Sequence, residues 1–187
     1  MASDQLDQSY EVAVQDAREQ ALLVSQWSGN GDSSFHVMNR SLDPVQDVSV
    51  AFQVQIAEDR NHQPPSGLVV FFVKLRSLPP CSEIIFATDA QDLHWKPANQ
   101  AVAMPATLPE MWTDDGTWRK VTSMRGTFFR GMRYTDRNGT KWGREKDGRL
   151  VTPDYEFAPL AGYKEPAPGR LSRTPPVKPL KTCDGGE

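Results

Sequence analysis

The stretch VSVAFQVQI, residues 48–56, decides the fold. Large apolar and mostly polar side chains alternate along it, so that one face of the extended chain is hydrophobic. This two-residue period is typical of a strand with one buried face. The face expected inside carries Val48, Val50, Phe52, Val54 and Ile56, and the other carries Asp47, Ser49, Ala51, Gln53 and Gln55. The stretch therefore predicts a half-buried antiparallel strand.

Further strand signals lie on both sides of this stretch. The period of two recurs at residues 35–38 and 124–135, and residues 68–73 are apolar throughout, which predicts a strand covered on both faces. Residues 83–86 begin another short strand, and Asn138-Gly139 suits a type I′ hairpin turn. Strands separated by turn signals, with little helix, predict an immunoglobulin-like antiparallel β-sandwich. A small barrel is the competing architecture.

The N-terminal region predicts a short amphipathic helix. Apolar residues recur every three or four positions, at Tyr10, Val14, Ala17, Ala21 and Val24, which is the spacing of one helix face. We expect residues 1–9 to be loose, the helix to end near residue 19, and a strand to follow. The stripe is too short for an independent coiled coil. It can pack on the sandwich or on a partner helix, including a second copy of the chain.

The composition changes after residue 151. Seven of the fifteen prolines lie in residues 153–187, where aliphatic residues are few. Such a segment buries too little apolar surface to offset its chain entropy, so we expect a disordered or partly polyproline II tail. The predicted organisation is an arm with a short helix over 1–19, a sandwich domain over 20–151 and a disordered tail over 152–187. Residues 88–117 lack a sustained period and form an irregular excursion within the domain.

Charges are unevenly distributed along the chain. Residues 1–117 hold 6 Lys or Arg against 16 Asp or Glu, whereas residues 118–149 hold 10 against 3. Such segregation can create a potential that steers a charged partner. The alternative is that acidic and basic strands lie side by side in the sheet and neutralise one another.

Three segments are familiar when they are read together. They are Gln20-Ala21 with Val24-Ser25-Gln26-Trp27, then Asn39-Arg40-Ser41 with Pro44-Val45-Gln46-Asp47-Val48-Ser49-Val50, and last Tyr134-Thr135-Asp136-Arg137-Asn138-Gly139 with Trp142-Gly143-Arg144 and Gly148-Arg149-Leu150. In this order they resemble an immunoglobulin-like domain of many uncharacterised bacterial proteins, where it often follows a membrane-anchoring or coiled-coil region. The resemblance covers residues 20–151 and implies the fold. That family has no established catalytic residues to carry over, and no transmembrane segment precedes the domain here.

The last of these segments also has a structural explanation. Asp136 is expected to bind the turn amides, and Gly139 to supply the positive φ of the turn. Trp142 is expected to cover the end of the sandwich, with its indole N–H reaching a carbonyl. Tyr134 is expected to face the core.

Little in the chain predicts catalysis. The three histidines, His36, His62 and His94, are dispersed, and no Gly-x-Ser-x-Gly elbow, dinucleotide-binding glycine motif or P-loop occurs. Cys81 and Cys183 are too few for a disulfide framework and lack a second ligand pair for a metal. We therefore predict no catalytic residue, no metal site and no cofactor.

No part of the sequence predicts a membrane span or secretion. The longest apolar run, residues 68–73, is far shorter than the roughly 18 residues needed to cross a bilayer. No secretory signal pattern follows Met1. These features lead us to expect a cytoplasmic protein.

Two segments have features of binding sites. The first is a basic hairpin over 124–149, whose interleaved aromatic residues suit nucleic acid, an anionic surface or an acidic protein. Its expected contact residues are Arg125, Arg130, Arg133, Arg137, Lys141 and Arg144. The second is a polyproline ligand in the tail, in which prolines three apart follow a cation, at Arg173, Pro176 and Pro179.

These observations favour a non-catalytic protein-interaction or accessory module with a protein partner. The alternative is polyanion binding through the basic hairpin. The second alternative is a small enzyme of unknown reaction, for which residues 88–117 offer the only place to build a pocket lid.

Overall fold

The computed structural model describes residues 2–29, 34–55, 68–86, 93–95, 118–120, 127–151, 167–172 and 175–183. Within these residues the chain forms one helix, α1 (Ala2–Leu22), and thirteen strands. The expectation of a mainly β protein with an N-terminal helix is therefore confirmed.

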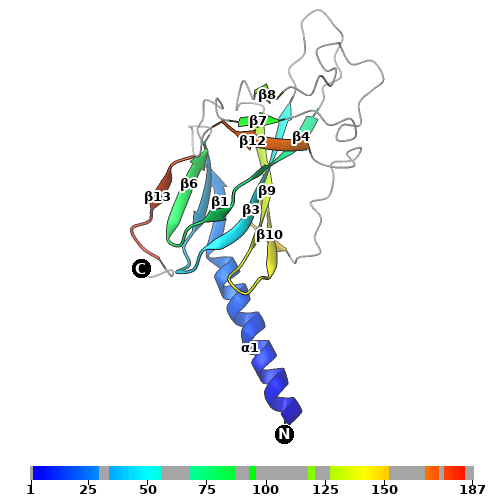
Figure 1. Ribbon diagram of the computed structural model, residues 1–187, viewed down its shortest axis with the longest axis vertical. Coiled ribbons are helices and arrows are strands. Elements are labelled where there is room, and N and C mark those ends of the chain that lie inside the picture. Colours follow the sequence, from blue (N-terminus) through cyan, green and yellow to red (C-terminus); the bar gives the residue numbers. More distant parts are fainter. Residues whose placement is uncertain are drawn as a thin grey trace, which may run out of the picture.

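The strands form two sheets, which Figure 1 shows as the body of the molecule. The smaller sheet runs in the order β1 (Val24–Ser28), β2 (Phe35–Asn39), β6 (Ser82–Phe86) and β13 (Val177–Pro179). The larger sheet runs in the order β11 (Leu150–Val151), β10 (Lys141–Glu145), β9 (Thr127–Thr135), β3 (Val45–Gln55), β4 (Leu68–Lys74), β12 (Ala167–Leu171), β7 (Leu93–Trp95) and β8 (Arg119–Lys120). A short strand, β5 (Ser77–Leu78), also pairs with β3. The chain crosses to the larger sheet between β2 and β3 and returns between β5 and β6.

Aromatic side chains from both sheets meet in one core. The ring centre of Phe52 on β3 lies 5.5 Å from that of Phe35 on β2 and 5.3 Å from that of Phe86 on β6. Phe71 and Phe129, from the two strands that flank β3, contact the same ring. Burial of large apolar side chains is the main favourable term in folding. This cluster therefore holds the two sheets together as the layers of a sandwich.

The alternation predicted along β3 is confirmed for the inner face, but Ala51 and Gln53, on the face expected outside, are buried as well, so this part of the strand is covered on both sides. The inner face carries Val48, Val50 and Phe52, all fully buried. Val45 is also buried although it has the opposite parity, because the register with β9 shifts around Asp47, which takes a φ of 50°. A bulge of this kind inserts one residue and turns the preceding side chains over. Ile56 lies outside the described residues.

The hairpin between β9 and β10 forms where expected, but with a different turn. A type I′ turn needs positive φ at both Asn138 and Gly139, and only Gly139 has it, at 82°. The amide of Gly139 donates to the Asp136 carbonyl at 3.1 Å, and the amide of Asp136 donates to the Thr140 carbonyl at 2.9 Å. A type I turn followed by a left-handed glycine has these features, so the type I′ prediction is wrong.

The helix is longer than expected. It begins at Ala2 and ends at Leu22, whereas we expected loose residues 1–9 and an end near residue 19. No glycine or proline interrupts residues 2–22, and good helix formers can extend a helix through a polar stretch. After a single turn residue the chain enters β1.

The prediction of a wholly disordered tail is wrong at two places. β12 lies between β4 and β7, and β13 pairs with β6. β12 runs parallel to β4, so the larger sheet is mixed rather than antiparallel throughout. A disulfide joins Cys81 to Cys183. The composition of the tail did not predict these strands, because the free backbone groups at a sheet edge can pair with an extended segment regardless of its side chains.

The excursion at residues 88–117 is described only at β7. This short strand carries Leu93 and Trp95, which are both buried. It pairs with β12 on one side and with β8 on the other. The remaining residues of the excursion lie outside the described part of the chain.

Candidate functional site: a helical arm and its anchor

Arg144 and Tyr134 hold the C-terminal end of α1 on the sandwich. Both side chains point inward from the neighbouring strands β10 and β9, and Arg144 is only 7% exposed. Nη2 of Arg144 donates to the carbonyls of Ala21 and Leu22 at 3.0 Å each, and the Tyr134 hydroxyl donates to the Ala21 carbonyl at 2.9 Å. The last carbonyls of a helix have no partner within it. These two side chains therefore cap α1 from the sandwich.

The charges at this anchor suit a helix end. The C-terminus of a helix is the negative end of its dipole, and a cation there stabilises it by up to about 2 kcal/mol where the site is partly buried. Burial raises the pKa of Tyr134 well above its ordinary value; the charge of Arg144 opposes this shift and that of Asp136 adds to it. The Tyr134 hydroxyl therefore stays protonated and keeps donating to the helix.

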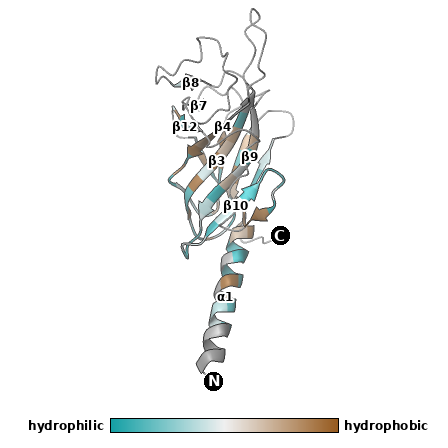
Figure 2. Ribbon diagram, turned by 90° about the vertical axis from the view of Figure 1, so that its right-hand side faces the viewer, coloured by the Kyte–Doolittle hydropathy of each residue, from teal (hydrophilic) through white to brown (hydrophobic). Residues whose placement is uncertain are grey.

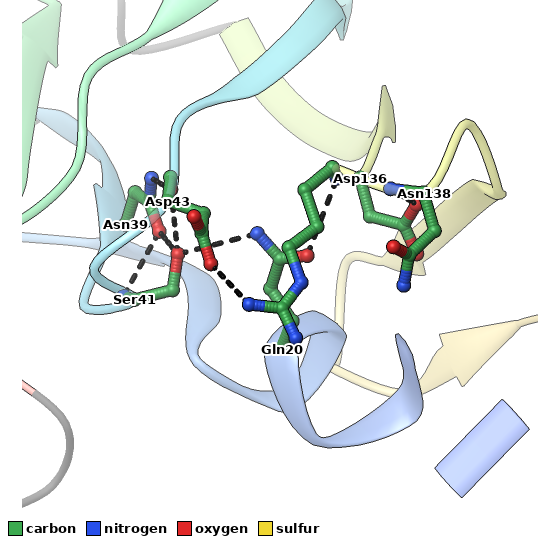
Figure 3. Close-up of polar contacts among 7 residues, drawn as sticks. Gln20, Asn39, Ser41, Asp43, Asp136 and Asn138 are labelled. Carbon is green, nitrogen blue, oxygen red and sulfur yellow. Dashed lines mark hydrogen bonds and ion pairs between the residues drawn. The ribbon is translucent and has the colours of Figure 1, made fainter. Parts of the chain in front are cut away.

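Polar contacts also tie the last turn of α1 to two loops (Figure 3). Nε2 of the buried Gln20 lies 3.5 Å from Ser41 Oγ, and its Oε1 accepts from the amide of Arg137 at 3.3 Å. The Ser41 amide donates to Asn39 Oδ1 at 3.0 Å, and the Arg137 guanidinium pairs with the Asp43 carboxylate at 2.7 Å. The loop after β2 and the β9–β10 hairpin thus hold Gln20 from two sides.

Asp136 shapes the hairpin that makes this contact. Its Oδ1 accepts from the amides of Asn138 and Thr140, at 2.9 and 2.8 Å. Its Oδ2 accepts from Trp142 Nε1 at 2.8 Å. The predicted bonds to the turn amides are confirmed. The indole N–H, however, reaches this carboxylate rather than a carbonyl.

Beyond its anchor, α1 projects from one end of the sandwich (Figures 1 and 2). Every side chain described between residues 8 and 19 is exposed. Three of them are large and apolar: Tyr10 is 73% exposed, Val12 59% and Val14 47%. The stripe predicted from the sequence is therefore divided, because Ala21 and Val24 are buried in the sandwich while Tyr10 and Val14 face solvent. Helices owe most of their stability to the packing of an apolar face, whereas the projecting half of α1 leaves these apolar side chains exposed.

Two members of the expected basic face have partners within the fold. Arg144 is buried at the anchor, so its assignment to a surface face is wrong. Arg137 pairs with Asp43. Arg149, nearby on the same hairpin, pairs with Glu145. Neither pair joins an acidic strand to a basic one, since Arg137–Asp43 joins two loops and Arg149–Glu145 lies within one hairpin. Neutralisation between neighbouring strands therefore stays a prediction.

Among the aromatic side chains described in the hairpin, Phe129 and Tyr134 are buried and Trp142 is half-buried. Arg130 is half-buried, Lys141 is exposed, and the Arg133 guanidinium lies 6.0 Å from the ring centre of Phe72. Arg125 lies outside the described residues. Tyr134 is buried, as expected, so it cannot stack on a nucleic acid base in the way that single-strand binding requires.

The tail residues proposed as a polyproline ligand lie in or next to a strand. Pro179 ends β13 and is paired with Ser82, and Pro176 is exposed just before that strand. Arg173 lies outside the described residues. A polyproline II ligand needs its segment free of other backbone pairing. β13 must therefore leave β6 before this motif can be bound.

A hydrogen-bonded chain of three side chains lies on the outer face of the smaller sheet. Nε2 of His36 lies 2.7 Å from Ser34 Oγ, and its Nδ1 lies 2.6 Å from Glu83 Oε1. Hydroxyl, imidazole and carboxylate follow one another as in a serine hydrolase triad. Ser34, however, is only 3% exposed, and Trp27 stacks on the imidazole with ring centres 4.8 Å apart. In this structure the hydroxyl is covered, and the His36–Glu83 hydrogen bond links β2 to β6.

In the part of the chain that the structure describes, no helix is long and apolar enough to cross a membrane. The same residues hold no group of three His, Cys, Asp or Glu side chains placed to bind a metal ion. Comparison of the chain with protein-family models, with curated proteins and with solved structures gave no match.

Sequence reasoning missed this anchor, although one signal for it was present. Arg144 has the same strand parity as Trp142, which was expected to lie against the sandwich. The positive charge led instead to a surface assignment. Nothing in the local sequence indicates the partner of Arg144, because the bond to Ala21 joins residues 123 positions apart.

Proposed function

We propose that the protein is a non-catalytic interaction module that presents α1 to a protein partner. The observation that carries this proposal is a helix fixed at one end whose projecting part exposes large apolar side chains. A single exposed apolar residue is normal. Tyr10 and Val14, however, lie four positions apart and so share one face of the helix. Recognition of a helix in a groove uses anchors at this spacing.

The anchor supports binding by limiting the freedom of the arm. Three side chains hold the last turn of α1. Arg144 and Tyr134 donate to its carbonyls, and Gln20 accepts from the amide of Arg137. Groups that are ordered before association lose less conformational entropy when they bind. A helix held at a set angle therefore presents its anchors with a smaller entropic cost than a free peptide would.

The charge of α1 supports a particular partner chemistry. Residues 2–22 contain five acidic side chains and one basic side chain. Pairing with a second copy side by side in parallel would bring like charges together, which is unfavourable. A groove or helix that is apolar at its centre and carries Lys and Arg at its rim complements both features of the arm. The proposed partner is a protein with such a basic-rimmed apolar surface.

The sandwich is, in this proposal, an immunoglobulin-like domain that acts as the support for the arm. The three-segment resemblance, the two stacked sheets and the chain crossings between them support this assignment. The parallel pairing of β12 with β4 is an addition to the expected antiparallel pattern.

Matched substitutions on α1 test the proposal. Val14→Ser removes an anchor from the stripe, whereas Val12→Ser makes the same chemical change two positions away. Two residues turn a helix by about 200°, so Val12 lies on nearly the opposite face. The immobilised wild-type chain and both variants are used to capture partners from the source cells, and sedimentation equilibrium measures self-association.

We expect Val14→Ser to lose a specific partner that wild type and Val12→Ser both retain. The captured partner should bind purified wild type directly, with an affinity that falls as salt is raised, because opposite charges contribute at the rim. Equal binding by all three proteins would refute the role of the arm. A dimer of wild type that Val14→Ser abolishes would keep the arm but replace the basic partner with a second copy.

A further inference from the structure

Noncovalent contacts hold the last strand, β13, only weakly. It has three residues, all exposed, and it lies at the edge of the smaller sheet beside β6. Pro179 has no amide proton to donate to the ladder. A strand this short buries little apolar surface to offset the entropy lost when it is ordered. Something else must keep it in place.

The two cysteines lie where such a strand needs to be tied. Cys81 directly precedes β6, and Cys183 follows β13 closely. Their Cα atoms are 5.4 Å apart, within the ordinary range for a disulfide, and the two side chains are bonded. The amide of Leu180, just after β13, also donates to the Cys81 carbonyl at 2.9 Å. The chain contains only these two cysteines, so both are used in this one bond.

We infer that the Cys81–Cys183 bond is a structural latch, formed in an oxidising compartment, that keeps β13 on β6. A thiol–disulfide oxidoreductase is the oxidant. One cysteine thiolate attacks the disulfide of that protein to form a mixed disulfide, and the other cysteine displaces it. The oxidoreductase leaves as a dithiol that carries the two electrons and two protons. In the reduced chain, β13 dissociates and the edge of β6 is uncovered.

An oxidising compartment differs from the cytoplasmic location expected from the sequence. Structural disulfides form and persist where the surroundings are oxidising and are rare in the cytosol. The latch and the arm depend on different bonds, because the disulfide ties β13 to β6 whereas α1 is held by residues of β9, β10 and the adjoining loops. They meet at Ser41, whose carbonyl accepts from the Cys81 amide at 3.0 Å.

Thiol counting and hydrogen exchange test the latch. The full chain is exported to the bacterial periplasm, purified without reductant, denatured and treated with N-ethylmaleimide before its intact mass is measured. We expect no alkylation of this material, and two alkylated sites after prior reduction. Alkylation of both cysteines without reduction would overturn the disulfide.

Exchange of the peptide covering residues 175–183 then tests the role of the bond. In folded protein treated with reductant, and in the variant Cys81→Ser/Cys183→Ser, we expect this peptide to exchange at least about tenfold faster. Peptides from β1, at the opposite edge of the same sheet, should be unchanged. Unchanged exchange at residues 175–183 in the reduced protein would show that β13 does not need the latch. The reduced wild type provides this measurement even if the variant fails to fold.

Discussion

Replacing Arg144 with Met tests the anchor most directly. The guanidinium is buried and donates to the carbonyls of Ala21, Leu22 and Gly148, at 3.0, 3.0 and 2.6 Å. Methionine has a similar length and fills much of the same space, but it cannot donate a hydrogen bond. The substitution therefore removes three hydrogen bonds and one positive charge, and only the bond to Ala21 is fully buried.

The expected loss of stability follows from these contacts. A hydrogen bond from a charged donor contributes about 1.5–3 kcal/mol net, and the carbonyl of Ala21 keeps its bond from the Tyr134 hydroxyl. Leu22 and Gly148 lose a donor, and the helix end loses a favourable charge worth up to about 2 kcal/mol. Removal of a buried charge offsets part of this loss. The free energy of unfolding should fall by about 3–4 kcal/mol.

Urea unfolding and hydrogen exchange measure the effect. With a urea slope of about 2 kcal/mol per molar, the midpoint should fall by about 1.5–2 M. Exchange of α1 amides near residue 20 should accelerate more than exchange of β3, because the cap is lost locally. Lys141→Met is the matched control, since Lys141 lies on the same strand with an exposed side chain, and it should cost less than about 1 kcal/mol. Equal effects of the two substitutions would refute the anchor.

Three further substitutions extend this reasoning. Tyr134→Phe should cost about 1 kcal/mol at neutral pH. Burial raises the pKa of Tyr134, so the folded protein keeps the hydroxyl protonated at a pH where the unfolded chain loses the proton. The free energy of unfolding of wild type should therefore fall by up to about 1.4 kcal/mol per pH unit above about pH 10. Thermal melts at rising pH should show this fall in wild type and not in Tyr134→Phe. Gly169→Ala would place a Cβ atom 2.7 Å from the Phe72 carbonyl oxygen, so it should release β12 and cost about 1–3 kcal/mol, seen as faster exchange of residues 167–172. Asp136→Ala removes the acceptor of two turn amides and of Trp142, and should lower the free energy of unfolding measured in urea by about 3 kcal/mol.

For each of these three predictions, one outcome would contradict it. An identical alkaline decline in wild type and Tyr134→Phe would mean that other groups cause it. Pro168→Ala, an exposed neighbour, is the control for Gly169→Ala, and equal exchange in the two would show that the close approach is relieved at no cost. Unaltered stability of Asp136→Ala would show that water replaces the carboxylate at the turn.

The sequence was informative wherever local pattern and burial coincide. Val48, Val50 and Phe52 lie inside because alternate side chains of a strand face opposite sides, and this period is visible in the sequence. The bulge at Asp47 was not visible, because its positive φ reflects pairing with β9. Arg144 was misplaced because charge normally indicates the surface, and only buried carbonyls from a distant helix make its burial favourable.

The amino-acid sequence by itself determined the mainly β architecture, the hairpin position and the helical face of the arm. The strands and the helical face depend on apolar side chains that recur periodically within a few residues of one another, and the hairpin depends on a glycine. Only the tertiary structure decided where α1 is capped, which sheet edges accept β12 and β13, and that Cys81 meets Cys183 across 102 positions. These contacts join backbone groups and side chains from distant segments, and such groups carry no local pattern because their partners are supplied only when the chain folds.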